Sequence, residues 1–336
     1  MFEVKDLEVC FRKKGQDFPA VTGLSYKIDH NEILGIVGES GCGKSISSLA
    51  LMGLLPKTAR VTKGEMSVDG DVYTDFAPEK LAGLRGDQIS MIFQEPMTAL
   101  NPLFTVGRQI SEAYEIHHPH ASKEEAREAT YEIMRKCGLP RVETLYREYP
   151  HQLSGGMRQR IVIAMALINK PEVIIADEPT TALDVTIQAQ ILNLLKKLNS
   201  EEGTSVVLIS HDLGIIREIC ENVIVMYAGH VVESGNVDTI FSDPQHPYTK
   251  GLIASIPTAA KKGRKLHTIP GTVPPLYKRN HQQCCFLDRC ECASQCCRNA
   301  VPELINVGTH FVRCMKADRK FREQAEHQTV TAETEA

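Results

Sequence analysis

Residues 38–45 read GESGCGKS, which matches the pattern G-x-x-x-x-G-K-S/T. An apolar run, EILGIVG at 32–38, precedes this stretch, and a helical pattern, SISSLALMGLL at 45–55, follows it. The glycines permit a tight loop whose backbone N–H groups converge on phosphate oxygens, and a helix that follows directs its positive N-terminus at the same point. The stretch therefore predicts a strand, a phosphate-binding loop and a helix in succession.

The residue types of this loop indicate ATP with Mg²⁺ as the ligand. We expect Lys44 to neutralise the β- and γ-phosphates and the Ser45 hydroxyl to bind Mg²⁺. Cys42 occupies a position where the pattern accepts any residue, so we assign it no chemistry of its own. The whole expected ATP-binding loop is Gly38, Glu39, Ser40, Gly41, Cys42, Gly43, Lys44 and Ser45.

A second stretch, VIIADE at 173–178, is an apolar strand that ends in two carboxylates. Acidic residues at a strand end are often simple turn residues, but here they accompany a phosphate loop. We expect Asp177 to hold the Mg²⁺ shell and Glu178 to polarise the attacking water as a general base.

Composition limits the classes of function. The chain has 336 residues, of which 42% are hydrophobic and 24% charged, and its net charge is -4. This charge does not favour nucleic acid or an anionic membrane surface as a partner. The N-terminus lacks the features of a signal peptide, and no apolar run approaches the roughly 18 residues that a membrane span needs. We therefore expect a cytoplasmic protein with reduced thiols.

The expected fold class is a three-layer α/β core. Compact apolar runs at 32–38, 89–93, 172–177, 205–210 and 223–228 are typical of buried parallel strands. Alternating stretches at 2–11, 22–29 and 64–73 predict a small antiparallel β layer. A helical insertion is expected at about 100–165, with Ser122 as an N-cap and Gly138 as a stop signal. Residues 255–280 have the composition of a linker.

The stretch LSGGMRQR at 153–160 resembles the signature motif of ABC-transporter ATPases. Ser154 suits the cap of a helix, and Gly155 and Gly156 leave its first amides bare for an anion. This resemblance implies an ABC-type P-loop NTPase core with a mixed sheet. It also implies that the signature of one subunit completes the ATP site of another.

Other elements of that family follow in order. Gln94 resembles the Q-loop residue that touches Mg²⁺ and the attacking water, and ALD at 182–184 resembles the D-loop of the dimer interface. His211 resembles the switch histidine that contacts the γ-phosphate. Phe11 stands where the family places an aromatic ring against adenine. The resemblance implies Glu178, His211 and Gln94 as the catalytic set, with Mg²⁺ bound through Ser45, Gln94 and Asp177.

Longer stretches resemble the ATPases of oligopeptide and dipeptide importers, and some nickel importers share them. They are QEPMTALNPLFTVG (94–107), ADEPTTALDVTIQAQIL (176–192), HPYTKGLIASIP (246–257) and IPGTVPPL (269–276). The resemblance implies an ATPase that powers import of peptides, or of nickel or another small solute. A soluble ABC ATPase of translation or DNA repair fits less well, because such chains usually carry two cores or long coiled-coil insertions.

The resemblance also implies partners and an organisation for the chain. The expected partners are two membrane-spanning permease subunits, a second, paralogous ATPase in a heterodimer, and an extracytoplasmic solute-binding protein. The chain itself would lie at the cytoplasmic face of the membrane. Residues 1–254 would form the ATPase domain, 255–322 an importer-type C-terminal region with a cysteine cluster, and 323–336 a disordered tail.

The cysteine cluster is QCCFLDRCECASQCC at 283–297, with Cys314 following. Within the importer subfamily a similar pattern binds a 4Fe–4S cluster, which here implies Cys284, Cys290, Cys297 and Cys314 as ligands. Gln283 and Asp288 depart from the subfamily's glycine and proline, and three cysteines have no assigned role: Cys285, Cys292 and Cys296. Zinc and free thiols remain alternatives to the cluster.

Overall fold

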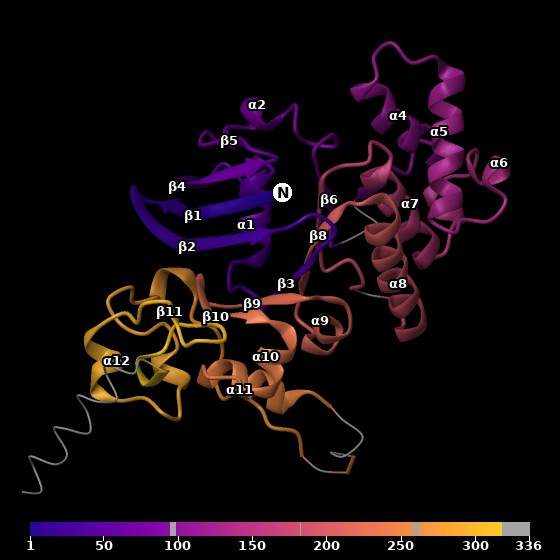
Figure 1. The fold of residues 1–336 in the computed structure, drawn as a ribbon. Helices are drawn as coiled ribbons and strands as arrows, with labels where there is room; N and C mark the ends of the chain where they lie inside the picture. Colours follow the sequence, from indigo (N-terminus) through magenta and orange to yellow (C-terminus); the bar gives the residue numbers. More distant parts are fainter. Residues whose placement is uncertain (95–98, 182, 258–261, 264, 318–336) are drawn as a thin grey trace, which may run out of the picture.

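A computed structural model describes the chain except residues 95–98, 182, 258–261, 264 and 318–336 (Figure 1). The tail at 323–336, which the sequence predicts to be disordered, lies outside the described residues, as does the alanine of the ALD stretch.

An antiparallel sheet forms from the N-terminal part of the chain, in the order β2-β1-β4-β5. Its side chains alternate between buried and exposed along β1, where Phe2, Val4 and Leu7 are buried. The predicted antiparallel layer is thus confirmed, although the second strand begins at residue 16 and not at 22. The bounds are β1 (Phe2–Lys13), β2 (Gln16–Ile28), β4 (Ala59–Val68) and β5 (Asp71–Tyr73).

The central sheet has the order β11-β12-β10-β9-β3-β8-β7-β6. The strands from β9 to β6 run parallel, and the runs that the sequence marked as buried strands form them. The sequence did not predict β10, which pairs antiparallel with β9. The bounds are β3 (Ile33–Val37), β6 (Ile89–Ile92), β7 (Val173–Asp177), β8 (Ser205–Ser210), β9 (Asn222–Tyr227), β10 (His230–Asn236), β11 (Ile305–Asn306) and β12 (Phe311–Val312).

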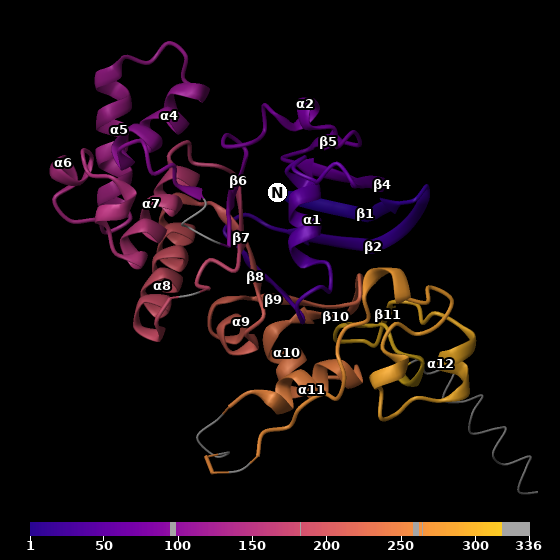
Figure 2. The ribbon, with the colours of Figure 1, turned by 180° about the vertical axis from the view of Figure 1, so that it is seen from behind.

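The central sheet is covered on both faces, which explains why its strands read as continuous apolar runs. Along β3, Ile33 and Val37 join the core that includes α7 and α8, whereas Leu34 and Ile36 join the core shared with the antiparallel sheet and α1. Figures 1 and 2 show the antiparallel sheet and α1 on one side of the central strands and the helical group on the other. The three-layer α/β architecture is confirmed.

The cap and the stop signal that the sequence predicts within the helical region both flank α5. Ser122 caps α5 through a capping box with Glu125, and Gly138, at φ +69°, follows the end of that helix. The helices of the first two-thirds of the chain are α1 (Lys44–Leu51), α2 (Pro78–Leu81), α4 (Val106–His117), α5 (Lys123–Lys136), α6 (Val142–Leu145), α7 (Gly155–Leu167) and α8 (Val185–Glu202).

The C-terminal region packs along the β10 edge of the central sheet, below the antiparallel sheet in Figure 1. A buried pair connects this region to β10: His310 Nε2 lies 2.9 Å from the Glu233 carboxylate, and both side chains are fully buried. None of the helices within the described ranges combines the length and apolar character that crossing a membrane requires. The remaining helices are α9 (Leu213–Ile219), α10 (Val237–Ser242), α11 (Pro247–Ser255) and α12 (Gln295–Asn299).

Candidate active site

The loop between β3 and α1 requires glycine at defined positions. A Cβ added to Gly38 would lie 2.2 Å from the carbonyl oxygen of Met226, a contact with rigid backbone that no side chain tolerates. Gly43 precedes α1 at φ +112°, which side-chain-bearing residues rarely adopt. The glycines therefore allow the loop to lie close against β9 and to turn directly into the N-terminus of α1.

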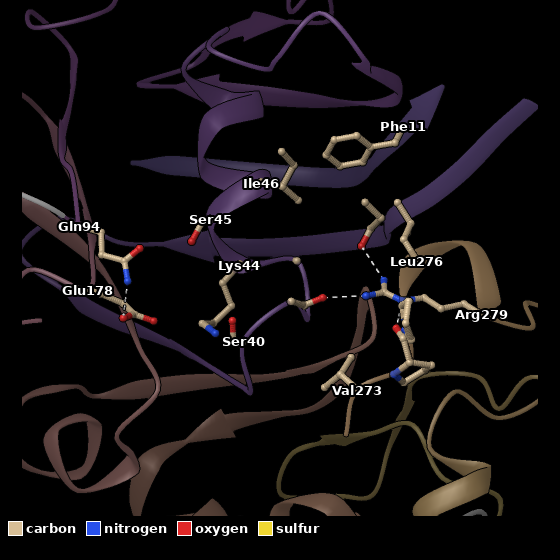
Figure 3. A pocket seen from close by; sticks show the side chains of 15 residues that line it. Phe11, Ser40, Lys44, Ser45, Ile46, Gln94, Glu178, Val273, Leu276 and Arg279 are labelled. Carbon is tan, nitrogen blue, oxygen red and sulfur yellow. Dashed lines mark hydrogen bonds between the residues drawn. The ribbon is translucent and has the colours of Figure 1, made fainter. Parts of the chain in front are cut away.

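Lys44 and Ser45 lie at the start of α1 and point toward the cavity beside the loop (Figure 3). The Lys44 ammonium is buried and donates to the carbonyl oxygen of Gly38 at 2.7 Å. The Ser45 hydroxyl donates to the Asp177 carboxylate at 3.1 Å. Burial raises the pKa of Asp177, and the hydrogen bond from Ser45 partly offsets this. A hydroxyl and a carboxylate in contact are oxygen ligands of the kind Mg²⁺ uses.

Glu178 directly follows β7, and two other predicted residues, Gln94 and His211, contact its carboxylate. Its carboxylate accepts a hydrogen bond from the Gln94 amide at 3.0 Å, and it lies 3.2 Å from Nδ1 of His211. It also accepts a hydrogen bond from the Thr181 hydroxyl at 2.9 Å, a contact that the sequence did not predict. Glu178 has φ +47°, which aims the side chain differently from a residue that continued the strand.

A cavity of about 400 Å³ lies beside the loop, and we call it the phosphate-loop cavity. Phe11, at the end of β1, lines it together with Lys44 and Ser45, and Gln94 and Glu178 line its other end (Figure 3). This volume is within the range of small-molecule sites. The structure thus brings the predicted aromatic, phosphate-binding and acidic residues to one cavity.

The LSGG stretch does not line the phosphate-loop cavity of its own chain. Ser154 caps α7, its hydroxyl accepting from the Met157 N–H at 3.3 Å, and its side chain is exposed. A Cβ on Gly156 would lie 2.8 Å from the Ile187 side chain of α8, so the glycine permits close packing of these helices. Ser154 and the glycines after it are not among the residues that line the phosphate-loop cavity. Ser154 is exposed, and Gly155 and Gly156 are half-buried.

The four cysteines of the predicted cluster lie near one another. The backbone N–H of Cys284 donates to the carbonyl of Cys297 at 2.9 Å. Burial raises the pKa of Cys290 to about 11 and also raises that of Cys314, and the Cys284 thiolate contributes to both shifts. A hydrogen bond from Cys285 lowers the pKa of Cys284 to about 7. None of the eleven cysteines forms a disulfide.

The spacing of the sulfur atoms bears on the zinc interpretation. Four thiolates on one zinc ion would lie about 3.8 Å apart, from a Zn–S bond of about 2.3 Å in a tetrahedron. Among the described residues, no three cysteine sulfurs come within 4.8 Å of one another. The described residues therefore show no preformed tetrahedral zinc site of cysteines.

Several residues at the cavity were missed by the sequence analysis. The linker-like composition of 255–280 gave no sign that Leu276 and Arg279 line the phosphate-loop cavity. Tyr248 and Arg289, which contact the loop, lie within stretches that the resemblance had singled out, HPYTKGLIASIP and the cysteine pattern. The resemblance of these two stretches to importer ATPases marked them as functional, but it did not indicate that they contact the loop.

Comparison with known proteins defines the class. The ABC transporter family matches residues 21–181, and the family described as the oligopeptide/dipeptide transporter C-terminal region matches residues 232–297. The ATP-binding cassette MJ0796, solved as a post-hydrolysis dimer bound to ADP and Pi, is 33% identical with a TM-score of 0.62, covering 70% of this chain and 99% of that one. The fold is that of an ABC-transporter ATPase.

Curated relatives narrow the class further. The oligopeptide transport ATP-binding protein AppD of Bacillus subtilis is 44% identical over 97% of this chain and 99% of its own length. The dipeptide transport ATP-binding protein DppD of Haemophilus influenzae is 45% identical over 94% of each chain. The chain belongs to the family of oligopeptide and dipeptide transport ATP-binding proteins.

Proposed function

We propose that this chain is the ATP-hydrolysing subunit that powers import of peptides through a membrane-embedded ABC transporter. One observation supports this most strongly: Gln94 and His211 both contact the Glu178 carboxylate, at one end of a cavity whose floor carries Lys44 and Ser45. The named relatives transport oligopeptides and dipeptides, which supports peptide as the solute class.

The proposed site takes ATP with its phosphates on the loop at 38–45 and its base toward Phe11. Lys44 neutralises the β- and γ-phosphates. Ser45, Asp177 and Gln94 hold Mg²⁺, which draws charge from the phosphate oxygens. Glu178 accepts a proton from the attacking water, and His211 contacts the γ-phosphate.

A second subunit completes the site in this proposal. The N-terminus of α7 at Ser154, Gly155 and Gly156 is of a kind that binds anions. It does not line the phosphate-loop cavity of its own chain, so the phosphate that it binds would be that of a partner subunit. In a head-to-tail pair it would close over the partner's ATP. Binding would hold the pair together, and hydrolysis would release it.

The proposed assembly contains two permease subunits, a second, paralogous ATPase and an extracytoplasmic solute-binding protein. It places this chain at the cytoplasmic face of the membrane. We propose residues 1–254 as the ATPase domain, with the helical part at about 100–165, and 255–322 as the importer-type C-terminal region.

Uptake by the assembled transporter tests this function. The chain is co-purified with its membrane subunits, reconstituted in vesicles with the binding protein, and supplied with Mg·ATP on the cytoplasmic side. We expect ATP-dependent accumulation of a labelled di- or oligopeptide and none of labelled Ni²⁺. Accumulation of Ni²⁺ alone would replace peptide with nickel as the solute, and uptake that does not depend on ATP would contradict the proposal.

We also propose that Cys284, Cys290, Cys297 and Cys314 hold a 4Fe–4S cluster. Two observations support it: the Cys284 thiolate helps to raise the pKa of Cys290 and Cys314, and the backbone N–H of Cys284 donates to the carbonyl of Cys297 at 2.9 Å. The low pKa of Cys284 favours the thiolate that a ligand must be. Such a group would supply redox or structural chemistry to the C-terminal region.

Anaerobic purification tests the cluster. We expect about four iron and four sulfide per chain with absorbance near 400 nm, as four cysteine ligands imply. Cys290→Ser should lose the iron, whereas Cys292→Ser, which alters an exposed cysteine outside the proposed set, should keep it. Bound zinc without sulfide would contradict the cluster.

A further inference from the structure

One wall of the phosphate-loop cavity comes from the C-terminal region and not from the ATPase core. Figure 3 shows Leu276 and Arg279 facing Phe11 across the end of the cavity remote from Glu178. This wall comes from one short stretch of sequence, 273–279, and is mostly apolar. Its residues are Val273, Pro274, Pro275, Leu276 and Arg279, and we call them the C-terminal wall.

Arg279 joins the C-terminal wall to the phosphate loop. Its guanidinium donates to the carbonyl oxygen of Gly41 at 2.7 Å and to that of Ala20, on β2, at 3.4 Å. Its Nε donates to the carbonyl of Pro274 within the wall at 3.3 Å. One half-buried side chain therefore fixes the relative positions of the loop, the antiparallel sheet and the wall (Figure 3).

A second contact with the C-terminal region is made by Glu39, two residues before Gly41 in the loop. Arg289, from the cysteine-rich segment, donates to both carboxylate oxygens of Glu39 at 3.0 Å, and its side chain is only 6% exposed. The backbone N–H of Glu39 donates to the Tyr248 hydroxyl at 2.9 Å. Arg289 also donates to the carbonyl of Pro270 at 2.7 Å, just before the wall. Arg279 and Arg289 thus both connect the first half of the loop to the wall or to the residues just before it.

We propose that the C-terminal wall is the nucleobase side of the ATP site, with the base held between Phe11 and Leu276. This rests on the proposed function, because it assumes that the cavity takes ATP. With the γ-phosphate toward Glu178 and the β-phosphate at Lys44, the rest of the nucleotide extends to the end where Phe11 and Leu276 face each other. A flat apolar base is the part of ATP that such side chains would bind.

The two parts of the wall have separable roles. Leu276 contacts the base and so contributes to binding of nucleotides but not of a bare phosphate chain. Arg279 is a positioning residue, because it acts through the Gly41 carbonyl on the loop that binds phosphates. A change at Arg279 therefore affects every ligand that the loop binds, with or without a base.

Equilibrium binding to the purified full chain separates these roles, with Mg·ATP and Mg·tripolyphosphate as the two probes. Leu276→Ala is expected to weaken Mg·ATP by about fivefold to tenfold, from loss of apolar contact, and to leave tripolyphosphate unchanged. Val273→Ala, on the same wall, should give a smaller effect of the same pattern. Tyr277→Ala is the matched control, since this neighbour is exposed and does not line the cavity.

Arg279→Ala is expected to weaken both probes together, and Arg279→Lys should restore part of the affinity by keeping a donor near Gly41. Melting temperatures of all variants establish that they fold. Normal Mg·ATP affinity in Leu276→Ala, or an equal loss for both probes, would overturn the wall while leaving the ATPase function in place. Failure of the wild-type chain to bind Mg·ATP would overturn the function and the wall with it.

Discussion

Replacing Glu178 with glutamine is expected to lower ATP turnover by about a hundredfold to ten-thousandfold while ATP binding is retained. Glutamine keeps the shape of the side chain and its contact with the Gln94 amide through its own oxygen. It cannot take a proton from water, so we expect the rate of hydrolysis to fall while the affinity for ATP stays the same. Phosphate release at saturating Mg·ATP, measured beside equilibrium binding of Mg·ATP, gives both quantities.

The matched control for this change is Glu172→Gln. Glu172 directly precedes β7, whose other end leads into Glu178, and its side chain is exposed and outside the phosphate-loop cavity. The same substitution there should leave turnover within about twofold, as for other surface positions. Undiminished turnover in Glu178→Gln would show that another group serves as the base.

Replacing Lys44 with alanine is expected to remove most ATP affinity. The ammonium is buried at the start of α1, and charge-assisted hydrogen bonds of this kind contribute about 3 kcal/mol, which corresponds to roughly a hundredfold in the dissociation constant. The loss should appear equally for Mg·ATP and Mg·tripolyphosphate, because Lys44 acts on the phosphates. Titration calorimetry with both ligands measures it.

Lys57→Ala is the control for Lys44→Ala, because Lys57 is exposed and lies outside the phosphate-loop cavity. It removes the same charge and should not change either affinity. If Lys44→Ala bound Mg·ATP as well as the wild-type chain, the loop at 38–45 would not be the phosphate site. A melting curve separates loss of the ligand contact from loss of the fold, since Lys44 also bonds the Gly38 carbonyl.

Local sequence signals predicted the core of the fold because the apolar runs in the sequence are the same residues that the sheet buries. The run at 205–210 is a strand with the same bounds in the structure, since a strand covered on both faces must be apolar throughout. The Ser122 cap and the Gly138 stop were equally local. The strand β10 was missed because its Glu233 is polar yet fully buried, and it is satisfied by His310, which is distant in sequence.

The site residues that belong to a contiguous motif could be predicted from the sequence. Those that reach the site from a distant part of the chain could not. Lys44, Ser45 and Asp177 follow from their own stretches, and their contacts agree with the expectation. The C-terminal wall did not follow, because a proline-rich segment reads as a linker until its contacts are known. Arg279 reaches Gly41 across 238 residues, and no local pattern indicates such a contact.

The account depends on Glu178 coupling ATP hydrolysis to import, and one measurement tests this most directly. Phosphate release and labelled-peptide accumulation are followed together in vesicles that hold the assembled transporter, with either the wild-type chain or Glu178→Gln. We predict that Glu178→Gln binds Mg·ATP yet loses phosphate release and peptide accumulation in parallel. Continued peptide accumulation at the wild-type rate by Glu178→Gln vesicles would contradict the account.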